Sequence, residues 1–348
     1  MQGGVDWSKL PPEVFAHPAD LRALSALKKL PGAEWVMRQL ARHSYEDARR
    51  IALTAGALLC GRDAYPEVAE LLRDLCASLD VRPPEMFFRH EQIPSARILG
   101  DSRPFIIMSS VWLEILEPEE MRCLLARLVM HQHCGHLPYL AVCDFLQSFT
   151  AYAGIAAAPL SGLRLATEEW RRLAELSCDR GALLATGDLE ALRGLMLKQA
   201  GGGCGKWGGA NPDALRAQEK LFNDAVADAK LGRLYRLAMY LDAGIAFSAL
   251  RLGELERWAA GEEYQSFSSG DFSRSREADT QSPPEWGAFA PGMPAWGPSF
   301  ADREDTRESF FDNIKDAAAG AADLAQQGAG ALSKALSTFF DSLQESGK

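Results

Sequence analysis

The stretch from Leu125 to His136 constrains the fold more than any other part of this chain. It reads Leu-Ala-Arg-Leu-Val-Met-His-Gln-His-Cys-Gly-His, and its apolar spacing predicts one buried helix that carries histidines at its end. Histidines four residues apart share a helix face, so the pattern His-Glu-x-x-His can hold one Zn²⁺ while its Glu activates a bound water. With His136 as the second histidine of that pattern, Gln132 takes the place of the first and His133 the place of the Glu. The pattern is therefore broken, and a buried helix with hydrogen-bonded histidines is the competing interpretation.

A second predicted helix carries acidic residues at a spacing that suits the same site. The run Trp170–Leu184 places Glu175 and Asp179 four residues apart, within Ala-Glu-Leu-Ser-Cys-Asp-Arg-Gly-Ala-Leu-Leu. In one group of zinc peptidases the third metal ligand is a Glu on a later helix, in the pattern Glu-x-x-x-Asp followed by small apolar residues. Together with the first helix, this stretch resembles metallopeptidase family forty-eight, the HtpX-like and CAAX-prenyl-endopeptidase family, and in particular its cyanobacterial and plastid-type branch.

Three further stretches support the resemblance, which runs from about His17 to about Tyr264. Residues 101–116 resemble the family's edge strand and following helix, 117–129 the lead-in to the metal helix, and 18–32 the N-terminal preamble of the plastid-type branch. The resemblance implies a mainly α (α+β) fold, in which a zincin-like metallopeptidase domain has a small sheet beside the metal helix. It also implies an edge strand that holds extended substrate, although Ser95 stands where relatives have an Asn.

The resemblance also implies roles for individual residues. His136 and Glu175 would be metal ligands of a vestigial site. Asp179 would not touch the metal but would orient one of its ligands. Arg251 matches the end of a later family segment, whose hydrogen-bond-donating His falls at Ile245 in this chain. An isoleucine side chain cannot donate a hydrogen bond to a developing oxyanion. No catalytic residue is therefore expected, because the general-base position and the oxyanion-helper position have both lost the required side chain.

Two classes of function follow from these residues. The favoured one is a catalytically inactive metallopeptidase homologue, a pseudoenzyme that keeps the fold as a binding or assembly scaffold. The alternative is a zinc-dependent metalloendopeptidase with a rearranged site of His133, His136 and Glu175, in which no Glu remains to activate water. The neutral amide of Gln132 would be a poor Zn²⁺ ligand. No cofactor is therefore expected, and zinc belongs only to the alternative.

Composition limits the partners and the compartment. The 348 residues carry a formal net charge of −10, which argues against nucleic acid and against anionic lipid as charge-driven partners. The seven cysteines are odd in number and lack a Cys-x-x-Cys pair, so we expect reduced thiols in an intracellular, non-oxidising compartment. No secretory signal is expected at the N-terminus. The family resemblance adds a leaning towards the chloroplast, in the stroma or associated with the thylakoid.

Hydrophobic periodicity predicts the elements of the domain. Short β-rich runs cover Glu85–His90 and Pro104–Met108, with a loop over Ile93–Gly100 between them. The apolar run 145–160 is expected to be a packing helix, with a membrane-facing hairpin as the alternative. Further helices are predicted over 34–40, 45–59, 66–79, 164–187, 189–200, 211–241 and 245–259.

Changes of composition divide the chain into four parts. These are an N-terminal segment over 1–16, the peptidase-like domain over 17–264, a Pro/Gly/Ser-rich linker over 265–307, and a C-terminal amphipathic helix within 308–348. The linker cannot bury enough apolar surface to fold alone, so we expect it to be disordered. Apolar residues recur at helical spacing from Phe310 to Leu343, so another surface should cover that helix. We expect a protein partner bound through this tail, with peripheral membrane association left open.

Overall fold

The computed structural model of the chain describes residues 11–28, 45–91, 94–101, 103–153, 161–202, 210–227 and 248–270. Several expectations lie outside these residues: the helix over 34–40, the position of Ile245, nearly all of the linker, and the C-terminal helix. The four-part division of the chain thus stays a prediction.

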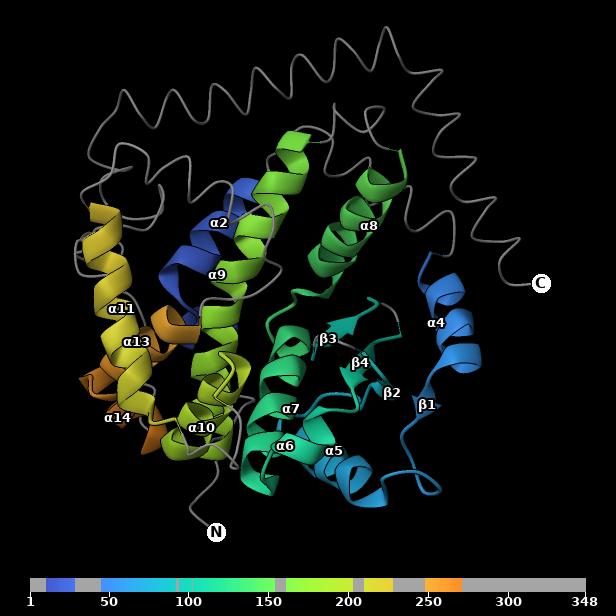
Figure 1. Cartoon of the computed structure of the whole chain (residues 1–348), viewed down its shortest axis with the longest axis horizontal. Helices are drawn as coiled ribbons and strands as arrows, with labels where there is room; N and C mark the ends of the chain where they lie inside the picture. Colours follow the sequence, from blue (N-terminus) through green and yellow to red (C-terminus); the bar gives the residue numbers. More distant parts are fainter. Residues whose placement is uncertain are drawn as a thin grey trace, which may run out of the picture.

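The described chain is mainly helical with one small mixed sheet, as the α+β prediction requires (Figure 1). The strands are β1 (Leu58–Leu59), β2 (Glu85–Arg89), β3 (Ala96–Leu99) and β4 (Phe105–Ser109). The helices are α1 (Pro12–Phe15), α2 (Pro18–Lys28), α4 (Tyr45–Gly56), α5 (Pro66–Ser78), α6 (Trp112–Ile115), α7 (Pro118–His133), α8 (Leu137–Ala153), α9 (Ser161–Thr186), α10 (Leu189–Gln199), α11 (Pro212–Ala227), α13 (Ser248–Ala259) and α14 (Glu262–Ser268).

The sheet has the strand order β1-β2-β4-β3. β2 and β4 run parallel, with Met86 opposite Ile106, while β1 and β3 pair antiparallel on the outer sides. All five residues of β4 are buried, as expected for a central strand made of one continuous apolar run. The resemblance suggested an edge strand in this region, and that is wrong for β4, which lies between β2 and β3.

Two boundaries near the sheet also differ from the predictions. The predicted loop over 93–100 contains β3, whose residues 96–99 pair with β4. The predicted helix over 45–59 ends at Gly56, because Leu58 and Leu59 form β1 against Phe88 and Phe87 of β2. Backbone hydrogen bonds to a neighbouring strand make both segments β-strands, and the periodicity of a single segment does not reveal such pairing.

The two helices that carry the motifs pack against each other, as predicted from the sequence. α7 begins with Pro118 at its first position, and the Glu117 N–H donates to the Glu120 carboxylate at 2.8 Å, which defines the helix start. On α9, Gly181 permits close approach, since a β-carbon there would lie 2.3 Å from the Met130 side chain. α7 therefore lies between α9 and the sheet, at the centre of the main core (Figure 1).

The apolar run 145–160 supplies the second half of α8 as far as Ala153, and its first two residues are buried against the core. Phe145 and Leu146 are both fully buried, which agrees with a packing helix over this part of the run. Residues 154–160 lie outside the described residues. Among the helices that the structure describes, none combines the length and hydropathy needed to cross a bilayer.

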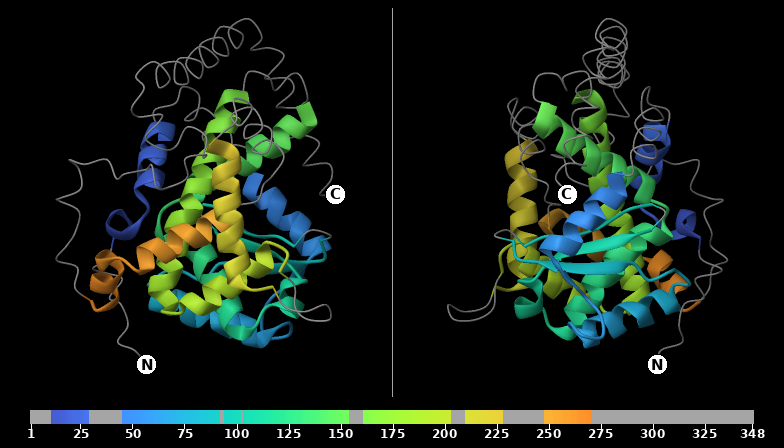
Figure 2. Two further views of the ribbon diagram at one scale, coloured as in Figure 1. Left: turned by 60° about the vertical axis from the view of Figure 1, so that its left-hand side comes forward. Right: turned by 90° about the vertical axis from the view of Figure 1, so that its right-hand side faces the viewer.

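The N-terminal helices close the far side of α9, away from the sheet, where α13 and α14 also lie (Figure 2). Phe15 is fully buried in the main core, as is Phe267 of α14. The His17 N–H donates to the Ser177 hydroxyl at 2.9 Å. The His17 Nδ1 accepts from the Ala19 N–H at 3.2 Å, so its Nε2 carries the proton and faces a Glu254 oxygen 3.0 Å away.

His17 should make the stability of the domain depend on pH. Burial and the Arg180 guanidinium lower the pKa of His17 to about 4, although Glu254 and Asp20 act in the opposite direction. The unfolded chain keeps this histidine near the ordinary pKa of about 6.5, so the unfolded state takes up the proton first as the pH falls. The free energy of unfolding should thus decrease by roughly 3 kcal/mol from about pH 6.5 to about pH 4.

Urea denaturation of the wild type and of His17→Asn at pH 7 and pH 4.5 measures this contribution. The variant lacks the titrating imidazole, so acidification should cost it about 2 kcal/mol less than it costs the wild type. Equal losses in the two proteins would mean that His17 is not held neutral by its surroundings.

Candidate functional site

The end of α7 differs from the predicted metal helix, because α7 stops at His133 and does not continue to His136. Gly135 has a left-handed φ of +68°, and its N–H donates to the Gln132 carbonyl at 3.1 Å. The His136 N–H donates to the His131 carbonyl at 2.9 Å. These two bonds form a Schellman motif, whose left-handed position favours glycine. The helix predicted through His136 is therefore wrong at its end, and positions 132 and 136 do not share a helix face.

The chain reversal places His136 beside His131, which the sequence analysis did not select. The Nδ1 atoms of the two rings are 3.1 Å apart, and the ring centroids are 5.3 Å apart. Both side chains are nearly inaccessible to solvent, with 3% and 2% exposure. A search for histidines four residues apart cannot find this pair. The signal that could have found it is Gly135, a helix-ending residue directly before His136.

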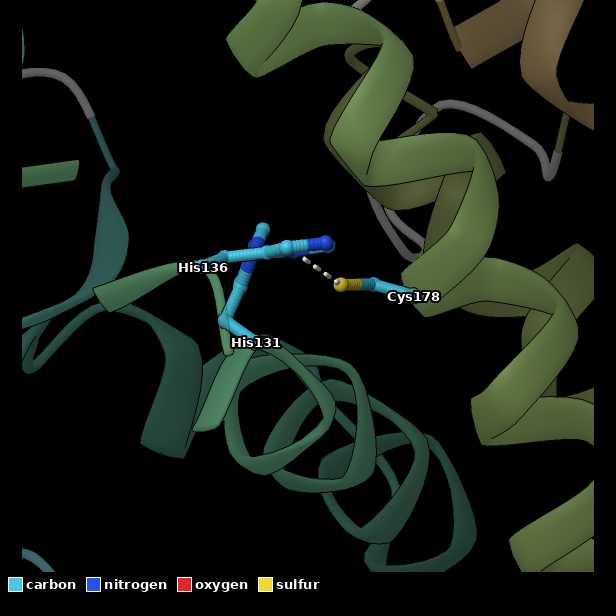
Figure 3. A group of neighbouring side chains, drawn as sticks. All are labelled: His131, His136 and Cys178. Carbon is cyan, nitrogen blue, oxygen red and sulfur yellow. Dashed lines mark hydrogen bonds between the residues drawn. The ribbon is translucent and has the colours of Figure 1, made fainter. Parts of the chain in front are cut away.

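Cys178 faces the histidine pair (Figure 3), and two carboxylates contact the rings as well. The Sγ of Cys178, on α9, lies 4.0 Å from the Nδ1 of His136. The Oδ2 of Asp20, on α2, lies 3.2 Å from the Nε2 of His136. The Oε1 of Glu175, on α9, lies 3.5 Å from the Nε2 of His131. Each imidazole thus has a carboxylate at its Nε2 and turns its Nδ1 towards the other ring.

The fully buried Asp20 is ionised because its surroundings supply donors. The Trp170 indole N–H donates to one carboxylate oxygen at 2.9 Å, and the Ser177 hydroxyl donates to the other. Burial alone would raise the pKa of Asp20, but the bonds from His136, Ser177 and Trp170 outweigh burial and lower the pKa. Burial raises the pKa of the neighbouring Cys178 thiol well above its ordinary value. The isolated protein therefore presents an anionic carboxylate and a neutral thiol to the histidines.

A network of buried ion pairs lies next to this cluster. Arg127 of α7 donates to Glu175, and its Nε lies 2.7 Å from the Oδ1 of Asp179. Arg251 of α13 makes two bonds to the same Asp179 carboxylate, one of them from Nε at 2.7 Å. Burial would raise the pKa of Glu175, but Arg127 and His131 hold it well below its ordinary range. Glu175 is therefore an ionised carboxylate that is already engaged by a guanidinium.

The structure brings some of the predicted site residues together and separates others. Four of them share one neighbourhood. Arg127 contacts Glu175 and Asp179, Arg251 contacts Asp179, and His136 reaches Glu175 through His131. The Gln132 amide instead donates to the Arg82 carbonyl at 3.2 Å, and the His133 ring stacks on Phe15 with centroids 6.2 Å apart. Among the described residues, the group whose ligand atoms lie close enough to hold a metal ion is His131, His136 and Cys178.

The residues at the predicted positions do not fit a peptidase zinc centre. A zinc ion on His136 and Glu175 would have to replace the Arg127 guanidinium at the Glu175 carboxylate. Gln132 and His133 are turned to other partners. The ligand set of His133, His136 and Glu175 thus stays a prediction. We expected no cofactor because the motif left too few strong ligands. That expectation did not consider His131 and Cys178, which with His136 could hold a metal ion.

The chain is similar to an Arabidopsis thaliana protein named plastoglobule-localized metallopeptidase 48, chloroplastic. The two are 27% identical over 256 residues, which cover 72% of this chain and 74% of that protein. The chain resembles metallopeptidase family forty-eight. The resemblance predicted from the motifs is thereby confirmed, although the metallopeptidase helix is altered here as described. No protein-family model matches the chain, and no solved structure matches it.

Removing Arg251 should destabilise this metallopeptidase-like domain. The change Arg251→Met leaves Asp179, which is 1% exposed, buried with Arg127 as its remaining cation among the ion pairs described. Removing one partner of a buried pair typically costs about 3–5 kcal/mol, so we expect a loss near the lower value in urea denaturation. Arg257→Met is the matched control, since Arg257 is half-exposed and bonds Glu219 and Glu254 on the surface. It should cost less than about 1 kcal/mol, and equal losses in the two variants would contradict a structural role for the Arg251–Asp179 pair.

Proposed function

We propose that this protein is a catalytically inactive metallopeptidase homologue, which uses a zincin-like fold as a binding or assembly scaffold. The observation that supports this best is the end of α7. Because the helix stops at His133, positions 132 and 136 do not face one metal ion, and the side chain at 132 is a glutamine directed to Arg82. A helix that no longer presents its two ligand positions together has lost the basis of the peptidase metal site.

The group that would activate water is missing as well. The general-base position holds His133, which stacks on Phe15. The carboxylate of Glu175 is bound by Arg127, so it is not available to accept a proton from water. A general base typically contributes about 10²–10⁴-fold to such a reaction. Loss of both the ligand geometry and the base supports binding in place of turnover.

The second candidate is a zinc-dependent metalloendopeptidase that uses His133, His136 and Glu175. Similarity to a protein named as a metallopeptidase favours it. It requires two rearrangements of the described site. His133 would leave Phe15, and Glu175 would exchange the Arg127 guanidinium for a metal ion.

A plastid location follows from the same similarity. The name of the Arabidopsis relative places that protein in the chloroplast, at plastoglobules. We extend the plastid part of that statement to this chain, in the stroma or at the thylakoid. The six described cysteines are all free thiols, which suits a reducing compartment. The net charge of −10 supports protein partners over nucleic acid.

Purified full-length protein supplied with zinc should not cleave proteins. We would incubate it with denatured plastid proteins and identify new N-termini by mass spectrometry, alongside His136→Ala as the control for contaminating proteases. Wild type and control should give the same set of N-termini, because the site lacks a base. New N-termini that appear with wild type and disappear with His136→Ala would establish the peptidase candidate.

The C-terminal tail, residues 308–348, should bind the partner. Its apolar residues recur at helical spacing, and a single helix gains little stability unless another surface covers that stripe. We would compare affinity purification of the full chain with that of a chain ending at Gly270, and add a synthetic 308–343 peptide as competitor. The full chain should retain proteins that the shortened chain loses and that the peptide displaces. Identical recovery from both chains would rule out the tail as the docking device.

A further inference from the structure

We propose that the Nδ1 atoms of His131 and His136 and the thiolate of Cys178 form a buried zinc site, which ties the end of α7 to α9. This set of ligands differs from both sets that the motif suggested, and it does not depend on whether the protein cleaves peptides. The two histidines come from either side of the Schellman turn, and the cysteine comes from the facing helix (Figure 3).

The hydrogen-bond partners of the imidazoles are the first argument. The Nε2 of His136 lies 3.2 Å from the Asp20 carboxylate, and the Nε2 of His131 lies 3.5 Å from the Glu175 carboxylate. An ionised carboxylate can only accept, so each Nε2 must carry the proton. A neutral imidazole with its proton on Nε2 has a lone pair on Nδ1. With both rings neutral, the two Nδ1 atoms turn lone pairs towards each other at 3.1 Å, and a proton or a metal cation between them stabilises this arrangement.

The distances are the second argument. Zinc binds imidazole nitrogen at about 2.0–2.1 Å and thiolate sulfur at about 2.3 Å, so a tetrahedral ion holds its nitrogen ligands about 3.3 Å apart and nitrogen and sulfur about 3.6 Å apart. The two Nδ1 atoms are 3.1 Å apart, and the Sγ of Cys178 is 4.0 Å from the Nδ1 of His136. The ligand atoms of all three residues lie within 4.8 Å of one another, so shifts of up to about an ångström would complete the geometry. A mixed nitrogen and sulfur set is also the combination that zinc prefers.

The carboxylates that contact the two imidazoles also support a metal site. Histidines that bind metals generally donate the other ring N–H to a carboxylate, which fixes the tautomer and the ring orientation. Both histidines have such a carboxylate here. Asp20 is itself held by Trp170 and Ser177, and Glu175 by Arg127. Each imidazole thus faces a carboxylate that is itself held in place, as a preorganised metal site requires.

Burial indicates what the ion would do. His131, His136 and Cys178 are at most 3% exposed, so the ion would join packed helices and would have little contact with substrate. Three protein ligands leave one position of a tetrahedral ion for water. Binding replaces the thiol proton of Cys178, which passes to solvent, so zinc affinity should fall with decreasing pH.

Zinc itself is the probe for the test. Full-length protein would be freed of metal with a chelator and titrated with Zn²⁺ against a chromophoric competitor, and Co²⁺ would then replace zinc for absorption spectroscopy. We expect one equivalent of zinc per chain, a zinc-dependent rise in Tm, and a thiolate-to-cobalt charge-transfer band. Wild type that binds no zinc, or a cobalt derivative without that band, would overturn the proposal.

A pair of cysteine variants decides the sulfur ligand with little change in volume. Cys178→Ser should lose the charge-transfer band and weaken zinc binding by more than about 100-fold, since loss of a group that only hydrogen-bonds a ligand already costs about 10–100-fold. Cys143 is another buried thiol, and it donates to the Thr167 carbonyl at 3.4 Å. Cys143→Ser should leave the charge-transfer band and the zinc affinity unchanged. Cys178→Ser that binds zinc like wild type would overturn the site.

A pair of histidine variants separates this site from the rearranged peptidase site. His131→Ala should lose zinc and His133→Ala should keep it, with the fold of each checked by circular dichroism. The opposite result would replace the proposed site by His133, His136 and Glu175. If His131→Ala does not fold, the cysteine pair still decides. Peptide cleavage enters none of these measurements, so the zinc site and the inactive-homologue proposal can fail separately.

Discussion

The buried guanidinium of Arg127 is the interaction on which the rest of the site depends. A buried charge costs several kcal/mol unless it is paired, and Arg127 is paired with Glu175 and Asp179, one turn apart on α9. Both carboxylates must therefore face α7, which fixes the rotation of α9 about its axis. With that rotation set, Cys178 faces the end of α7, and Asp179 can also anchor Arg251 of α13.

The second constraint is the left-handed residue Gly135, which decides what the histidines can do. An uninterrupted helix would present positions 132 and 136 on one face. The reversal at Gly135 instead places the His136 ring edge-on against His131 and leaves position 132 beside Arg82. A single change of backbone direction thus converts a helix face suited to an exposed catalytic ion into an enclosed pair of imidazoles.

Much of this neighbourhood could be predicted from local patterns. The two central helices, their mutual packing and the grouping of His136 with Glu175 and Asp179 follow from helical spacing and the family resemblance. The end of α7 was missed because the metal-binding pattern places His136 inside the helix. His131 was missed because only histidines three or four residues apart were considered. Asp20 could not be found at all, since its partners Trp170 and Ser177 lie 150 and 157 residues away in the sequence. β1 and β3 were missed because cross-strand pairing defines them.

The enclosed carboxylate of Asp20 also bears on the order in which the chain folds during synthesis. Its donors Trp170 and Ser177 lie 150 and 157 residues later in the sequence. A ribosome adds roughly 5–20 residues per second, so α2 waits on the order of ten seconds before the surface that covers it emerges. During that interval its apolar side stays open to chaperones, proteases and other nascent chains. A translation product that stops before α9 can never bury this segment, and quality control should remove it.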